Sequence, residues 1–148
     1  MAALAQHYRV TRTVGAAMVA SLLVYALIVH LIRTQFAPFT GFARFPEWEI
    51  LRYVFVGMAV ADAVLIRVLR SRALAAGAAV GPPGAQLQVT SIVTFALCEA
   101  VGILGFVLFL IAGSAVDFYF FLVLSLLLFG IHFPRYEQWE AWARQIGR

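Results

Sequence analysis

The sequence is poor in charged residues and contains a single cysteine. Charged residues make up 12% of the 148 positions and hydrophobic residues 64%, whereas soluble domains are about 25% charged and about 45–50% apolar. A water-soluble fold of this size could not bury so much apolar surface, because small domains have a high ratio of surface to volume. One cysteine also excludes an intramolecular disulfide framework. The composition therefore predicts an integral membrane protein.

Lysine is absent, and arginine supplies all 11 basic residues. This bias fits a GC-rich genome, and we expect a bacterial inner-membrane protein. The formal net charge of +4 could indicate a nucleic-acid partner. The arginines lie at the ends of apolar segments, however, so we interpret them as signals of membrane topology and expect no nucleic-acid partner.

Four apolar segments are long enough, or nearly so, to cross a bilayer, which takes roughly 20 residues in a helix. In lipid every backbone polar group needs an internal partner, so single spans are expected to be helical. The fold class predicted is all-α: one membrane domain over residues 1–148, built as a four-transmembrane-helix bundle with a short interfacial helix at the C-terminus. The predicted spans are 14–32, 51–69, 89–112 and 117–133.

The arginines are distributed unevenly between the two sides of these spans. Three lie on one side, and eight lie on the other: Arg9, Arg12, Arg67, Arg70, Arg72, Arg135, Arg144 and Arg148. Loops rich in arginine stay in the cytoplasm. We therefore expect both termini and the loop 70–88 to be cytoplasmic.

Two segments outside the spans have a pattern of their own. The tail 134–147 repeats large apolar residues every three or four positions, which predicts an amphipathic helix on the inner leaflet; a partner-binding helix is the alternative. Residues 33–50 carry an aromatic residue at every third position, from Phe36 to Trp48, and Pro38 and Gly41 argue against a helix there. These aromatics are expected to lie at the headgroup level; a docking surface for another membrane subunit is the alternative.

Asp62 and Glu99 are the two acids in the interior of the predicted spans, whereas Asp117 is the first residue of the fourth span. An ionised acid at the centre of a membrane helix costs about 2.5–3.5 kcal/mol on insertion scales, so such residues are functional candidates by default. A carboxyl group that is more stable with its proton can take it up from water and release it near a cation. Glu99 is about 15 Å from the start of its span, near the midplane, and Asp62 is expected one to two turns nearer the inner surface. Both are candidate ion-binding residues.

Small residues surround Glu99 along its helix. Cys98, Gly102 and Gly105 mark a stripe where another helix can approach closely. We predict that these three residues serve helix packing, with Cys98 a small buried residue and not a nucleophile.

The segment Thr94-Phe-Ala-Leu-Cys-Glu99-Ala-Val-Gly-Ile-Leu-Gly105-Phe-Val resembles the carboxylate helix of the proteolipid c subunit of rotary ATP synthases. The resemblance implies that the second and third helices form a hairpin with a polar cytoplasmic loop. It also implies that Glu99 binds the transported proton or sodium ion and that copies of the chain assemble with one another. Two features differ from the family: Val54–Leu69 contains Gly57 alone where the family repeats glycines, and the first and fourth helices are additional.

No other motif in the sequence indicates chemistry. His7, His30 and His132 fall at different depths, so we expect no metal and no cofactor. A phosphate loop, a cysteine pair and a nucleophile–base spacing are all missing, and an enzyme is not indicated. Two functions remain. The chain either carries a proton or ion through Glu99, or it is a non-catalytic accessory or structural subunit of a larger membrane complex. Its partners are the lipid bilayer and either further copies of itself or other membrane subunits.

Overall fold

The computed structural model describes residues 2–43, 47–75, 83–137 and 141. These residues form four α-helices and no strand, so the prediction of an all-helical chain with four helices is confirmed. The helices are α1 (Ala2–Gln35), α2 (Trp48–Ala75), α3 (Pro83–Ala112) and α4 (Ala115–His132).

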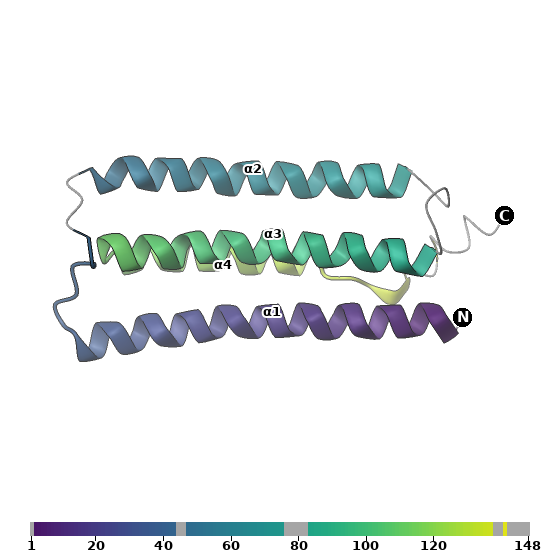
Figure 1. Ribbon diagram of the computed structural model, residues 1–148, viewed down its shortest axis with the longest axis horizontal. Helices are drawn as coiled ribbons and strands as arrows, with labels where there is room; N and C mark the ends of the chain where they lie inside the picture. The colour runs from purple at the N-terminus through teal and green to yellow at the C-terminus, as the bar shows by residue number, and fades with distance from the viewer. Residues whose placement is uncertain (1, 44–46, 76–82, 138–140, 142–148) are drawn as a thin grey trace.

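Helix α3 lies at the centre of the bundle. Helices α1 and α2 lie on opposite sides of it, and α4 runs along a third side, behind α3 in the view of Figure 1. The turn between α3 and α4 is as tight as the sequence predicted: Gly113 has a φ of +70°, and the Ser114 hydroxyl accepts a hydrogen bond from the backbone N–H of Asp117. Helix α3 is therefore in contact with all three other helices.

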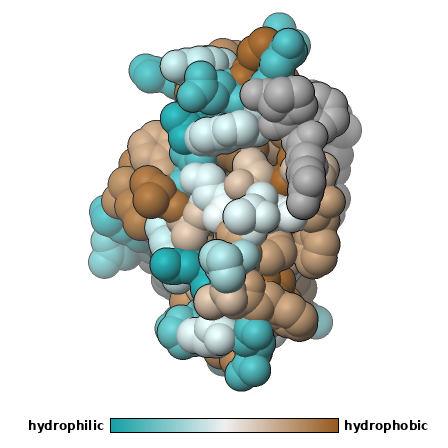
Figure 2. Space-filling model, turned by 90° about the vertical axis from the view of Figure 1, so that its left-hand side faces the viewer, coloured by the Kyte–Doolittle hydropathy of each residue, from teal (hydrophilic) through white to brown (hydrophobic). Residues whose placement is uncertain are grey.

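Three of the helices are long and apolar enough to cross a membrane: α1, α3 and α4. Helix α2 has 28 residues and is also long enough, but it carries several charged residues, among them Arg52, Asp62 and Arg67. Seen from the end where α2 and α4 begin, the surface mixes hydrophilic and hydrophobic residues (Figure 2). Such a mixture suits a surface at the level of lipid headgroups.

Helices α1 and α3 are longer than the spans predicted for them. Helix α1 begins at Ala2 and α3 at Pro83, each well before its apolar stretch. Polar side chains hold these extensions together, since the His7 ring hydrogen-bonds the Gln88 side chain across the two helices. Hydropathy marks the part of a helix that lies in lipid, whereas the backbone stays helical beyond it.

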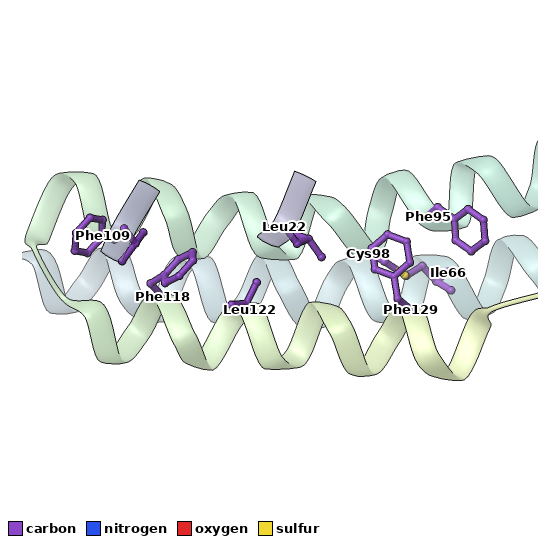
Figure 3. Packing of buried hydrophobic residues seen from close by; sticks show 9 residues of the cluster. Leu22, Ile66, Phe95, Cys98, Phe109, Phe118, Leu122 and Phe129 are labelled. Atoms are coloured by element: carbon purple, nitrogen blue, oxygen red, sulfur yellow. The ribbon is translucent and has the colours of Figure 1, made fainter. Parts of the chain in front are cut away.

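The core of the bundle is aromatic and aliphatic. Figure 3 shows Leu22 of α1, Ile66 of α2, Cys98 of α3 and Phe129 of α4 in one cluster, each almost completely buried. All four helices therefore contribute to this cluster. A second cluster joins α2, α3 and α4, and its buried members are Ala59, Val101, Leu108 and Phe121.

The loop after α1 docks on the end of α3. The backbone N–H of Phe42 donates to the carbonyl of Leu110 (2.8 Å), and that of Ala43 donates to the carbonyl of Ile111 (3.3 Å). These carbonyls belong to the last turn of α3, where no partner exists within the helix. Residues 36–43 are not helical, as predicted, whereas residues 33–35 belong to α1 and residues 48–50 belong to α2.

The aromatic residues of this loop are not equivalent. The Phe39 ring packs on Phe109 of the core, with 5.0 Å between ring centroids, whereas Phe36 and Phe42 are 69% and 76% exposed. Exposed rings fit both a headgroup-level belt and a docking surface. Phe45 and most of the predicted interfacial helix 134–147 lie outside the described residues.

Candidate functional site

Three polar residues lie at one depth in the bundle. Asp62 follows the first residue of α2 by 14 positions, Glu99 precedes the last residue of α3 by 13, and Ser21 precedes the last residue of α1 by 14. These three helix ends lie together in Figure 1. At about 1.5 Å per residue, all three side chains start about 20 Å from that end.

This depth differs from the one predicted for Asp62. Asp62 was expected nearer the inner surface because Arg67, five residues further on, was taken to mark that surface. In the structure α2 continues past Arg67 to Ala75, so Arg67 lies within the helix. Asp62 and Glu99 are therefore within about one helical turn of each other in depth.

Glu99 is hydrogen-bonded to Ser21 across the interface between α3 and α1. Its side chain is partly buried, and its neighbours Cys98 and Gly102 are buried. The Ser21 hydroxyl also lies 2.6 Å from the carbonyl oxygen of Met18. Glu99 thus sits at the edge of a close contact between two helices, beside a hydroxyl with two oxygen neighbours.

The hydrogen count at Ser21 is compatible with a protonated Glu99. A serine hydroxyl has one hydrogen to donate. If Ser21 donates it to the carbonyl of Met18, the remaining contact is satisfied when Glu99 carries a proton and donates it to the Ser21 oxygen. A protonated carboxyl also avoids the cost of a charge in an apolar surrounding. The arrangement can therefore hold a proton on Glu99.

Asp62 lies apart from Glu99. It belongs to α2, on the opposite side of α3 from α1, and its side chain is partly exposed. Within the described part of the chain it forms no hydrogen bond and no ion pair, and it does not bond to Glu99. The two candidate ion-binding residues share a depth and do not form one cluster.

The three predicted packing residues lie where other helices approach α3. The Ser125 hydroxyl donates to the carbonyl of Cys98 (2.6 Å) in the buried interface with α4. A Cβ atom on Gly102 would come within 2.4 Å of the Leu22 side chain, and one on Gly105 would come within 2.5 Å of the Phe121 Cβ. Small residues at these positions allow α1 and α4 to pack close to α3.

An ion pair between α2 and α4 was not predicted from the sequence. The Arg52 guanidinium contacts both carboxylate oxygens of Asp117, each at 3.0 Å, and its central carbon lies 4.6 Å from the centre of the Trp48 ring. Asp117 was expected at the boundary between a loop and the fourth span, with no partner assigned to it. The available signal was its place in the first turn of a helix, where the helix dipole favours an acid.

The histidines lie at separate places in the bundle. His7 is bonded to Gln88, the His132 ring is 2.9 Å from the carbonyl of Leu128, and His30 is exposed. Among the residues that the structure describes, no three metal-binding side chains come together. Compared with known proteins, the chain matches no family model, no curated protein and no solved structure.

Proposed function

We propose that this chain is a membrane protein with four spans in which Glu99 takes up and releases a proton near the middle of the bilayer. The observation that carries the proposal is the hydrogen bond between Glu99 and Ser21, together with the contact of Ser21 to the Met18 carbonyl. These contacts provide a site that is fully satisfied when Glu99 is protonated.

Helix α2 supplies the fourth span in this proposal. Its 28 residues extend over about 42 Å, more than the hydrocarbon thickness of about 30 Å. Two of the charged residues of α2 do not oppose its insertion into lipid. Arg52 is paired with Asp117, and Asp62 carries no charge while it is protonated. The outward side of α2 exposes large apolar residues that suit lipid: Ile50, Tyr53, Val54, Met58, Val60, Val64, Leu65 and Val68.

The proposed orientation places both termini in the cytoplasm of a bacterial inner membrane. Helices α1 and α3 begin and α2 ends at one end of the bundle, and α4 runs toward this end. Most of the described arginines gather there, whereas the opposite end has Arg33 and the paired Arg52. The rule that arginine-rich ends stay inside supports this orientation.

The position of Glu99 suits proton exchange better than a purely structural contact. The ionised form costs about 2.5–3.5 kcal/mol at the centre of a membrane helix. Glu99 is therefore expected to lose its proton only when water or a cation reaches the carboxyl group. The side chain is partly exposed at the edge of the α1–α3 contact. Asp62, at the same depth on α2, is a second carboxyl through which a proton could pass.

The alternative function is a non-catalytic accessory or structural subunit. In that case the hydrogen bond to Ser21 serves only to join α1 to α3. Hydrogen bonds between membrane helices contribute about 0.6 kcal/mol on average, which is enough for such a role. The resemblance to the c subunit favours proton or ion transport and assembly of copies into an oligomer, and the native mass in a mild detergent tests that assembly.

Carbodiimide labelling tests the proton-binding role of Glu99. Dicyclohexylcarbodiimide reacts with protonated carboxyls in apolar sites, so we expect labelling of Glu99 that decreases as the pH is raised. The Glu99→Gln variant should lose the label, and Asp62→Asn should keep it. A folded wild-type protein that takes up no label from mildly acidic to mildly alkaline pH would favour the accessory role.

A further inference from the structure

One end of the bundle carries a rim of arginines, which we call the basic rim. It comprises residues from α1, α2 and the segment after α4: Arg9, Arg12, Arg67, Arg70, Arg72 and Arg135. All except Arg70 are exposed. Among the residues described at this end, the only acid is Glu137. At the opposite end Arg33 and Arg52 are accompanied by three acids: Glu47, Glu49 and Asp117.

The spacing of arginines along the helices matches the thickness of a bilayer. Arg12 and Arg33 are 21 residues apart on α1, which is about 31 Å, and Arg52 and Arg72 are 20 residues apart on α2, which is about 30 Å. The hydrocarbon core of a bilayer is about 30 Å thick. The basic rim therefore lies at the level of the headgroups of one leaflet. The backbone of Arg67 is about 7.5 Å nearer the midplane than that of Arg72, and a long arginine side chain can extend from there to the headgroups.

The guanidinium groups of the rim are available to a ligand. Within the described residues Arg9, Arg12, Arg67, Arg72 and Arg135 form no ion pair. Arg70 donates one hydrogen bond, from Nη1 to the carbonyl of His132 (3.4 Å). A guanidinium has five N–H donors arranged to bind a phosphate with two parallel hydrogen bonds.

We propose that the basic rim binds the phosphate headgroups of anionic phospholipids such as phosphatidylglycerol. Basic clusters of four to eight residues beside a membrane helix are typical of such binding, because each arginine is attracted to the anionic membrane surface. The rim lies at the depth of the lipid headgroups, so its ligand is expected to be a lipid phosphate and not a soluble phosphate. This inference rests on the proposed membrane topology and is independent of proton exchange at Glu99.

Thermal unfolding of the full chain in a non-ionic detergent tests the inference. Phosphatidylglycerol should raise the unfolding temperature by several degrees, because a ligand that binds the folded state stabilises it. Phosphatidylcholine and soluble glycerol phosphate should raise it much less. Equal effects of the anionic lipid and of phosphatidylcholine, or of the anionic lipid and soluble phosphate, would overturn the inference.

Matched variants locate the effect at the rim. Replacing Arg67 and Arg72 by Gln should remove a large part of the stabilisation, whereas Arg33→Gln at the other end should keep it. Replacing the same two residues by Lys keeps the charge and should restore only part, because an ammonium group cannot form the paired hydrogen bonds. An unchanged lipid effect in the Gln variant contradicts the inference.

Two further measurements keep the test clear. If the Gln variant does not fold, native mass spectrometry of the wild-type chain replaces it. We expect the wild-type chain to retain anionic lipid in this measurement. Loss of all anionic lipid would count against the rim. The Glu99→Gln variant should respond to phosphatidylglycerol like the wild type. A failure of proton exchange would thus leave the lipid result unchanged.

Discussion

Arg52 at the start of α2 holds Asp117 at the start of α4 in a two-point ion pair, with Nε to Oδ1 and Nη2 to Oδ2 each 3.0 Å apart. Asp117 is almost buried, with 8% of its surface exposed. Helix α2 packs chiefly on α3, so this ion pair ties it to a second helix at the end of the bundle. The contact is a structural one and lies about 15 Å in depth from Glu99.

Replacing Arg52 by Leu should destabilise the bundle. Breaking a buried ion pair by removing one partner costs about 3–5 kcal/mol, but the Arg52 side chain is 35% exposed, and solvent screening reduces the loss to roughly 1–3 kcal/mol. Unfolding in detergent, followed by circular dichroism, measures the change. The double variant with Asp117→Leu should recover part of the stability, since no carboxylate is then left unpaired. A single variant as stable as the wild type would show that the ion pair contributes nothing.

Adding a methyl group at Gly105 should also destabilise the fold. The new Cβ would lie 2.5 Å from the Phe121 Cβ and 3.2 Å from the carbonyl oxygen of Phe118, atoms that cannot move without the backbone. Overpacking of this kind costs about 1–3 kcal/mol. Gly57→Ala on α2 is the matched control, because nothing lies within 4 Å of its Cβ position. It should be neutral or slightly stabilising, since alanine favours helix over glycine; equal losses at both positions would refute close packing at Gly105.

The Gly41→Ala variant should release the loop 36–43 from α3. Gly41 has a φ of +89°, and a Cβ there would lie 2.1 Å from the carbonyl oxygen of Ile111, which is a backbone atom. Hydrogen exchange at the amides of Phe42 and Ala43 reports the release, because these amides bond the last carbonyls of α3. We expect faster exchange at these two positions and little change in the middle of α3. Unchanged protection would show that the docking does not depend on this glycine.

The helices and the central acid could be predicted from the sequence because they depend on composition. Apolar runs of sufficient length indicated the four helices, and Glu99 stood out as an acid within such a run. The tight turn at Gly113 followed from the short gap between two apolar segments. These features are local, so no knowledge of how the helices face one another was needed.

The partners of the central acids could not be predicted in the same way. Which side chain meets Glu99 depends on the rotation of α1 against α3, and a helix with apolar residues all round gives no signal of its inward face. The depth of Asp62 was misjudged because Arg67 was taken to mark the inner surface, whereas α2 continues for eight residues beyond it. The pairing of Arg52 with Asp117 required the spatial neighbourhood of α2 and α4, which sequence order does not reveal.

Proton flux into liposomes tests the role of Glu99 most directly. The purified chain is reconstituted, a membrane potential is imposed, and internal pH is followed with a dye. We predict flux above that of protein-free liposomes for the wild type, background flux for Glu99→Gln, and wild-type flux for the control Glu137→Gln, an exposed acid beyond α4. Equal flux with and without the Glu99 carboxyl, or no flux in either form, would contradict proton exchange at Glu99.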